Sequence, residues 1–234
     1  VARAAFERLL ERLPDEVQVA LRTYGGDATG ACGTSALVHP MGPLDRPRLR
    51  ALARGLRARG KTPIAAALAQ VPSDFAPPDG EPEPEGERVV VMISDGRDTC
   101  GGDPLAEVRH LQRQGFRVRI HVVAFRVAEH DLPALARIAE TTGGRFLRAD
   151  DAAALDEALV SAVQTSFRVE DHGGQLVARG HAGPEGLTLP TGTFRLVIES
   201  QPEVVVEQVT VRADATTRVE LTAAADGLVG RVIE

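Results

Sequence analysis

Residues 88–104 read R-V-V-V-M-I-S-D-G-R-D-T-C-G-G-D-P, and this stretch decides the fold. Residues 89–93 form a continuous apolar run, which is too short for a core helix and rich in β-branched side chains, and Ser94-Asp95-Gly96 ends it. Such a run is typical of a strand that is buried on both faces of a parallel sheet. We therefore predict a central parallel strand with Asp95 at its carboxyl end.

The residues after this strand indicate a binding site at the edge of the sheet where the strand ends. Gly101 and Gly102 precede Asp103-Pro104, which suit the N-cap and the first position of the next helix. In open α/β sheets, ligands bind outside the carboxyl ends of the strands. Asp95 is therefore placed where binding or chemistry is expected.

Two motifs together resemble those of bacterial von Willebrand factor type A (VWA) domains. One is Ile93-Ser94-Asp95-Gly96 with the downstream residues 98–104, and the other is Gly60-Lys61-Thr62-Pro63-Ile64 at the start of an earlier helix. The resemblance covers residues 1 to about 165. It implies a metal-ion-dependent adhesion site in which Thr62 and Asp95 are ligands of Mg²⁺ or another divalent cation.

Thr62 has a second interpretation. Thr is a favourable N-cap and Pro63 suits the first helical position, so a helix from here to Leu68 would explain both residues without a ligand. The matching Asp95 motif favours the metal-ligand interpretation.

The family resemblance also implies a missing part. In the family, a central strand precedes the first helix and ends in an Asp-x-Ser-x-Ser segment that supplies most of the metal ligands. The sequence contains no such segment, and it begins with Val. We therefore expect that the first strand, and any signal peptide, lie upstream. Mg²⁺ takes about six oxygen ligands, so this chain alone should bind it weakly or not at all.

Composition limits the classes of function. The 234 residues suffice for two domains. No apolar run approaches the length of a membrane-spanning helix, so we expect no membrane span. A formal net charge of -6 argues against nucleic acid as a partner, because phosphate binding needs a basic surface.

Cys32 and Cys100 are too few for a zinc site on their own. Each follows the end of a predicted strand, so both fall at the same rim of the sheet, as a disulfide or as two buried thiols. A disulfide would stabilise the fold by roughly 4 kcal/mol on the chain-entropy model. Because disulfides persist in exported proteins, the pair and the resemblance predict a periplasmic or extracellular bacterial protein.

Strands alternate with helices up to residue 164, which predicts an α/β, doubly wound, mostly parallel sheet with helices on both faces. Residues 1–13 and 46–61 are amphipathic helices. The arginines of the second helix are expected to form a solvated face, with an anionic binding surface as the alternative. His39 is expected in a solvated loop.

From residue 165 onward the helical period disappears, and short strands separated by turns predict an antiparallel β-sandwich. Residues 189–196, L-P-T-G-T-F-R-L, resemble a hairpin of carboxypeptidase-regulatory-like domains. The predicted domains are therefore 1–164 and 165–234.

The motifs of common enzyme classes are absent from the sequence. It contains no Gly-x-Ser-x-Gly, no Gly-x-Gly-x-x-Gly and no Walker sequence, so we expect no enzyme. The resemblance implies an adhesion or protein-binding module in which a carboxylate of a protein partner completes the metal site. The alternative is a metal-free structural scaffold within an assembly.

Overall fold

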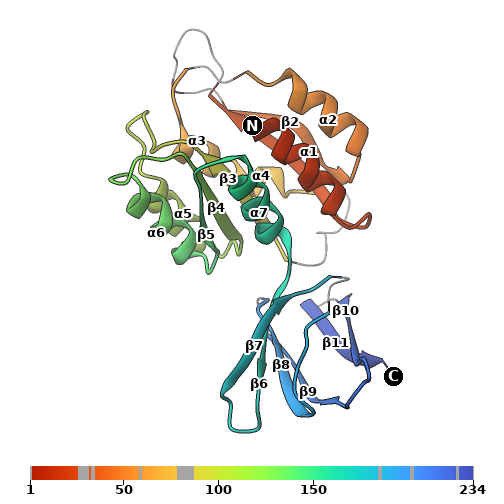
Figure 1. Cartoon of the computed structure of the whole chain (residues 1–234). Coiled ribbons are helices and arrows are strands. Elements are labelled where there is room, and N and C mark those ends of the chain that lie inside the picture. The colour runs from red at the N-terminus through yellow and green to blue at the C-terminus, as the bar shows by residue number, and fades with distance from the viewer. Residues whose placement is uncertain are drawn as a thin grey trace. The chain divides into compact units, whose positions relative to one another are not determined.

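The computed structural model describes residues 2–25, 32, 35–57, 60–77, 87–183, 186–200, 203–224 and 227–233 (Figure 1). The chain forms two compact units: the first covers the described residues up to Val163 apart from Glu87, and the second begins at Gln164. In the described parts, no helix is both long and apolar enough to cross a membrane.

The first unit alternates helices and strands. Its elements in chain order are α1 (Ala2–Arg12), β1 (Gln18–Tyr24), β2 (Ser35–Pro43), α2 (Arg46–Gly55), α3 (Ile64–Leu68), α4 (Val71–Asp74), β3 (Val89–Ser94), α5 (Pro104–Arg113), β4 (Arg119–Phe125), α6 (Leu132–Thr141), β5 (Phe146–Ala149) and α7 (Ala152–Val163).

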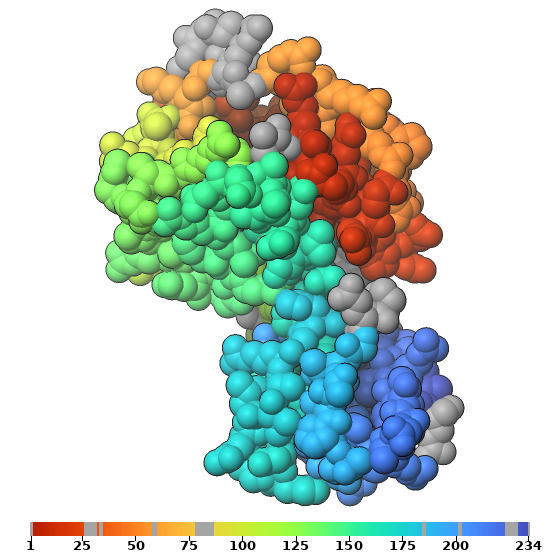
Figure 2. Space-filling view, viewed as in Figure 1, coloured from red at the N-terminus to blue at the C-terminus, as the bar shows by residue number. Residues whose placement is uncertain are grey.

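Strand β4 is the centre of a parallel sheet with the order β3-β4-β5. Residues 120–124 of β4 are at most 4% exposed, so both faces of the strand are buried. Ile120 and Val122 pack into a cluster with α3, α5 and α6, whereas Val123 packs into a cluster with α1 and α7 (Figure 1). In Figure 2 the residues of α1, in red, lie directly against those of α7. The structure confirms the doubly wound α/β fold.

Strands β1 and β2 form an antiparallel hairpin, which shares no ladder with β3 in the described residues. The sequence of β3 is as apolar as that of β4, yet Val90, Val91 and Ile93 are only half-buried. The difference arises because β3 pairs with β4 on one side, while no described strand pairs with its other side. The sheet is therefore interrupted between β1 and β3.

The N-termini of α5 and α3 show whether the capping predicted from the sequence occurs. Asp103 caps α5 as predicted, since its side chain accepts two backbone N–H groups of the first turn, each at 3.0 Å. Helix α3 begins after Pro63, which has no capping side chain; the Asp98 carboxylate accepts the N–H of Ala65 in its first turn, at 2.9 Å. Thr62 instead donates its own N–H to Thr99 Oγ1 at 2.7 Å. The N-cap interpretation of Thr62 is therefore wrong.

His39 was expected in a solvated loop, and this prediction is also wrong. His39 lies in β2, opposite Leu21 of β1, and is 6% exposed. The strand continues through Pro40 to Pro43, because proline is tolerated where its missing N–H faces away from the ladder.

Arginines of α2 face acidic side chains of α1 and of the turn that follows it. Three arginines spaced four residues apart pair with three acids of the same spacing: Arg46 with Asp15, Arg50 with Glu11, and Arg54 with Glu7. The residue numbers of the arginines increase along the ladder while those of their acidic partners decrease, so the two helices run antiparallel. We call these three pairs the arginine ladder. The expected solvated face is therefore an ion-paired contact between two helices.

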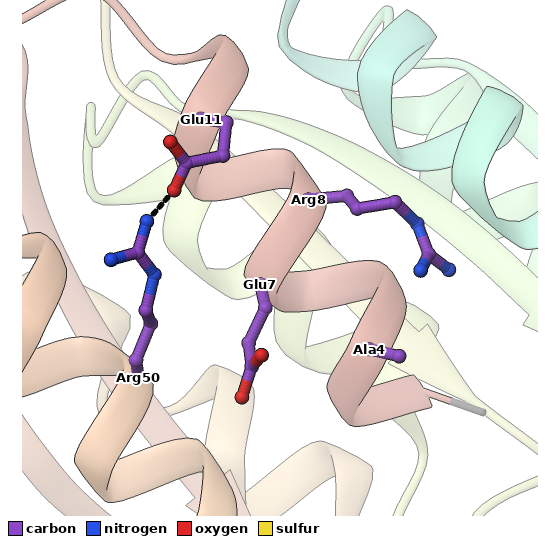
Figure 3. A pocket seen from close by; sticks show the side chains of 5 residues that line it. All are labelled: Ala4, Glu7, Arg8, Glu11 and Arg50. Carbon is purple, nitrogen blue, oxygen red and sulfur yellow. Dashed lines mark ion pairs between the residues drawn. The ribbon is translucent and has the colours of Figure 1, made fainter.

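Figure 3 shows a hollow beside the arginine ladder, with a volume of about 340 Å³, lined by Ala4, Glu7, Arg8, Glu11 and Arg50. The side chains of Arg50 and Glu11 point toward one another, and that of Arg8 points away from them (Figure 3). Arg8 pairs with Asp156 of α7 at 2.6 Å. Since each charged group that lines the hollow has an ion-pair partner, its charges are balanced within the fold.

Exchanging one pair of the ladder tests its contribution to stability. Arg54→Glu should lower the free energy of unfolding by about 0.5–1 kcal/mol, because an exposed attraction becomes a repulsion. Adding Glu7→Arg should restore most of the loss, as measured by urea unfolding. The control cycle combines Glu7→Arg with Arg57→Glu, since the Arg57 guanidinium donates to backbone carbonyls. If the coupling energy between residues 7 and 54 equalled that between residues 7 and 57, the ion pair of Glu7 and Arg54 would add no specific stability.

His121 lies on β4 in the core and is 4% exposed. Its Nδ1 accepts the backbone N–H of Arg145 at 3.0 Å, a bond that requires this nitrogen to be unprotonated. Burial is the largest cause that lowers the pKa of His121 to about 4, and the positive charges of Arg145 and Arg119 add to it. The native structure therefore holds a neutral histidine.

This depressed pKa predicts how stability depends on pH. The unfolded chain takes up the proton near pH 6.5 and the folded chain near pH 4, so the stabilisation is complete above pH 6.5 and is lost as the pH falls to 4. The loss should reach up to about 3 kcal/mol. In His121→Asn the amide oxygen accepts the same N–H without titrating, so urea unfolding should show a flatter pH profile. Parallel profiles for the two proteins would rule out this role of His121.

The second unit is all-β. Its strands are β6 (Ser166–Glu170), β7 (Leu176–His181), β8 (Gly192–Ile198), β9 (Val204–Val211), β10 (Arg218–Ala224) and β11 (Gly227–Ile233). Four strands form an antiparallel sheet in the order β7-β6-β8-β9, and β10 and β11 form an antiparallel hairpin. Phe194 and Ile198 of the sheet share a core with Val219 and Leu221 of the hairpin. This agrees with the predicted antiparallel β architecture.

Candidate functional site

Asp95 directly follows β3, and it is exposed at the carboxyl end of the parallel sheet. The Tyr24 hydroxyl donates to the carbonyl oxygen of Ile93 at 2.5 Å. The Ser94 hydroxyl donates to the carbonyl oxygen of Gly96 at 2.7 Å. The backbone is thus held on both sides of Asp95, which limits the positions that its carboxylate can take.

Tyr24 reaches the site from β1, across the interruption of the sheet. Burial raises the pKa of Tyr24 to about 12; a hydrogen bond with Ser94 opposes this shift, and the negative charge of Asp95 adds to it. The phenol therefore stays protonated near neutral pH and lies within electrostatic reach of Asp95. Because the chain has one Tyr and no Trp, Tyr24 is also a spectroscopic reporter of this site.

Asp98 organises the loop between β3 and α5. Its Oδ2 accepts the N–H of Ala65 at 2.9 Å, and its Oδ1 accepts the N–H groups of Cys100 at 2.7 Å and Gly102 at 3.3 Å. A Cβ atom at Gly102 would lie 2.5 Å from Cβ of Ala65, so the loop packs closely against α3. The Asp98 carboxylate therefore holds the loop in place.

Two hydrogen bonds fasten Thr62 to the same loop. The N–H of Thr62 donates to Thr99 Oγ1 at 2.7 Å, and the N–H of Thr99 donates to the Thr62 carbonyl oxygen at 3.1 Å. The structure thus places Thr62 beside the loop that begins at Asp95. Its side chain caps no helix, so helix capping does not account for a hydroxyl-bearing residue at this position.

A disulfide joins Cys32, between β1 and β2, to Cys100 in the loop after β3. Both cysteines are half-buried. The bridge spans 68 positions of the sequence and connects the hairpin to the loop that contains Asp98 and Thr99.

The donors at this rim match a hard cation in kind. Hydroxyl and carboxylate oxygens are ligands of Mg²⁺, which takes about six oxygens. Thr62 and Asp95 supply two donors of this kind. Within the described ranges, no group of three or more His, Cys, Asp or Glu side chains could hold a metal ion. The residues therefore fit part of a cation site.

The model of the von Willebrand factor type A domain family matches residues 1–161, well over half of the chain. The chain belongs to the VWA domain family. Two uncharacterized proteins of Bacillus subtilis (strain 168) are similar to it. YwmD is 26% identical over 165 residues, which cover 68% of this chain and 72% of YwmD. YwmC is 26% identical over 155 residues, which cover 63% of this chain and 66% of YwmC.

Solved VWA structures share the fold. A von Willebrand factor type A protein from Catenulispora acidiphila has a TM-score of 0.55 and 16% identity, covering 88% of this chain and 59% of its own. Proximal thread matrix protein 1 from the mussel byssus, with a zinc-occupied MIDAS motif, has a TM-score of 0.53 and 16% identity, covering 69% of this chain and 41% of its own. This chain thus spans less than two thirds of either protein, and at such identity the likeness concerns the fold alone.

The structure places residues at the candidate site that sequence reasoning did not identify. Tyr24 and Thr99 hold its two halves through hydrogen bonds. Thr99 lies within the quoted motif, but nothing in the motif marks its hydroxyl as an acceptor for Thr62. Tyr24 had one available signal, since it is the only tyrosine in the sequence.

Proposed function

We propose that this VWA domain is a non-enzymatic module that binds a protein partner through a divalent cation held beside Asp95. VWA domains generally mediate metal-dependent protein interaction, and the family match supports this reading. The observation that carries it is the hydrogen-bonded connection between Thr62, which caps no helix, and the loop that begins at the exposed Asp95.

Each participant would have one role. Thr62 would offer its hydroxyl oxygen, and Asp95 would offer a carboxylate oxygen directly or through water. When bound, Mg²⁺ would supply the positive charge that attracts a carboxylate of the protein partner. Asp98 would position the loop, because its own oxygens accept backbone N–H groups. Binding of this kind would be reversible and sensitive to chelators.

We propose further that the remaining ligands arrive on an extended segment between β1 and β3. Half-burial along β3 supports this, as does the absence of a ladder between these two strands in the described residues. The carboxyl ends of β1 and β3 lie together, since Tyr24 bonds Ile93, so one strand could run parallel to both. Apolar clusters lie on both faces of the sheet, so this strand would be apolar on both sides. It would end in the Asp-x-Ser-x-Ser segment of the family.

Terbium luminescence tests the cation site, because Tb³⁺ prefers oxygen ligands and is sensitised by a nearby phenol. Excitation of Tyr24 should produce saturable Tb³⁺ emission that Mg²⁺ competes away. Asp95→Asn and Thr62→Ala should each weaken Tb³⁺ binding at least about tenfold, as expected for the loss of a ligand. Asp151→Asn is the matched control: it removes one charge from the same rim, and Asn retains the cap that Asp151 provides for α7.

A synthetic peptide tests the proposed segment between β1 and β3. A valine-rich hexapeptide followed by Asp-Gly-Ser-Gly-Ser should strengthen Tb³⁺ binding to the wild-type chain, and a peptide with Ala in place of the Asp and Ser residues should not. Equal Tb³⁺ affinity in wild type, Asp95→Asn and Asp151→Asn, with or without the peptide, would exclude the metal site.

That result would favour a metal-free scaffold within an assembly, the second candidate function. The observation on its side is the absence, in the described residues, of a group of three or more metal-ligating side chains. A scaffold would bind its partner equally well after Asp95→Asn, whereas the cation mechanism requires that this substitution abolish partner binding.

The remaining features complete the proposal. The disulfide supports an exported, periplasmic or extracellular protein, because such bonds persist in oxidising compartments. We propose domains 1–164 and 165–234. The second would be a carboxypeptidase-regulatory-like unit that acts as a spacer or as a binding module. The partner would be a protein, with no role for nucleic acid.

A further inference from the structure

The β1–β2 hairpin is joined to the rest of its unit mainly through side chains. In the described structure it shares no backbone ladder with the parallel sheet. Three specific links connect it: Arg22 forms two hydrogen bonds of 2.6 Å with Asp74, Tyr24 bonds the Ile93 carbonyl, and Cys32 is bridged to a loop cysteine. Besides its chain connections to α1 and α2 and the packing of Tyr24 against the core, the hairpin is thus held by a few side-chain links, one of which is a disulfide.

Two of these three links end at the candidate site. Tyr24 holds the carbonyl two residues before Asp95, and Cys32 holds Cys100, five residues after it. The N–H of Cys100 is bonded to Asp98, and the neighbouring Thr99 is bonded to Thr62. Movement of the hairpin would therefore disturb both proposed cation ligands together.

We propose that the Cys32–Cys100 disulfide is a redox lock on this site: its reduction releases the hairpin, withdraws Tyr24 from the carbonyl of Ile93, and weakens cation binding beside Asp95. The last step rests on the proposed function, and the release of the hairpin does not. Both cysteines are half-buried, so the bond lies near the surface that a reductant would approach.

The reaction is a thiol–disulfide exchange with a dithiol reductant. A thiolate of the reductant attacks one sulfur and displaces the other as a thiolate. Its second thiol then breaks the mixed disulfide. The chain gains two electrons and two protons and carries two thiols, and the reductant leaves as its own disulfide. Reoxidation by a disulfide-bearing oxidant restores the lock.

Tyr24 reports the lock without any metal. In the oxidised chain the phenol should remain largely un-ionised after a rapid jump to pH 11, because its pKa is about 12. In Cys32→Ser/Cys100→Ser, and in the reduced wild type, a released phenol should ionise near pH 10. The absorbance at 295 nm should then be several-fold larger. At neutral pH, acrylamide should also quench Tyr24 fluorescence more strongly in the released forms.

Tb³⁺ binding tests the effect on the site in the same three samples, with Asp95→Asn as the reference for lost binding. The proposal predicts at least about fivefold weaker Tb³⁺ affinity in the double-serine variant than in the oxidised wild type, with native far-UV circular dichroism in both. If the variant does not fold, the reduced wild type, compared with its oxidised form, provides the same test.

Each outcome has one meaning. Unchanged Tyr24 ionisation and quenching after reduction would overturn the lock. A released Tyr24 with unchanged, Asp95-dependent Tb³⁺ affinity would overturn the coupling to the site. A released Tyr24 with no Asp95-dependent Tb³⁺ binding in any sample would overturn the proposed function and the last step with it, leaving the lock established.

Discussion

Gly144→Ala is expected to lower the free energy of unfolding of the first unit by about 3 kcal/mol or more. A Cβ atom at residue 144 would lie 2.0 Å from the carbonyl oxygen and 2.6 Å from the carbonyl carbon of Ile120. Those atoms belong to the backbone of β4, which pairs with strands on both sides. The clash therefore cannot be relieved by turning a side chain.

Gly55→Ala is the matched control for this substitution. Gly55 ends α2, and a Cβ atom there would meet nothing within 4 Å. Its stability should change by no more than about 0.5 kcal/mol. Urea unfolding, followed by far-UV circular dichroism, measures both variants. Similar midpoints for Gly144→Ala and Gly55→Ala would show that β4 can yield at this position.

Removal of the disulfide should have the second large effect. Cys32→Ser/Cys100→Ser should lower the free energy of unfolding by about 4 kcal/mol, since a loop of 68 residues is no longer closed in the unfolded chain. Urea unfolding of the oxidised wild type and of the variant, without reductant, gives the difference.

The disulfide prediction has an internal control, because a reductant should shift the unfolding midpoint of the wild type toward that of the variant. The variant itself contains no cysteine and should not respond. A wild type whose midpoint is unaffected by complete reduction, checked by thiol titration, would show that the bridge adds no stability.

Much of the fold could be predicted because local signals and tertiary structure agree. The run of residues 89–93 forms β3, and Asp103 caps α5 as its sequence indicates. These signals act within a few residues of the chain. The alternation of apolar segments and helices then suffices to predict the doubly wound order.

The wrong predictions share a physical cause, which is competition from partners distant in sequence. Thr62 has the features of an N-cap, but the carboxylate of Asp98 accepts the N–H of Ala65 in the first turn of α3. His39 precedes a proline, yet it pairs with β1 and is the buried residue of an otherwise exposed or half-buried strand. Arg50 and Arg54 have no acid within their own helix, and their partners lie on α1. Sequence periodicity describes a face of a helix, but not what that face will contact.

The residues of the candidate site remain a prediction from motifs, and the contacts that support them could not be predicted from the sequence. Asp95 and Thr62 follow from motifs, whereas Tyr24 reaches the site from 69 positions before the carbonyl that it binds. No local pattern encodes such a contact, because it depends on how the hairpin is placed against β3.

The interruption beside β3 also affects solubility. Unpaired strand edges are templates for pairing between chains, and proteins protect them with charges, prolines or short lengths. Residues 89–93 contain none of these features: the run is wholly apolar, and it is flanked by Arg88 and by Ser94-Asp95. Its carboxyl end is shielded by the Tyr24 phenol. Among the described residues this edge therefore lacks the usual protection, so the strand that builds the core would also favour pairing between chains if nothing covered it.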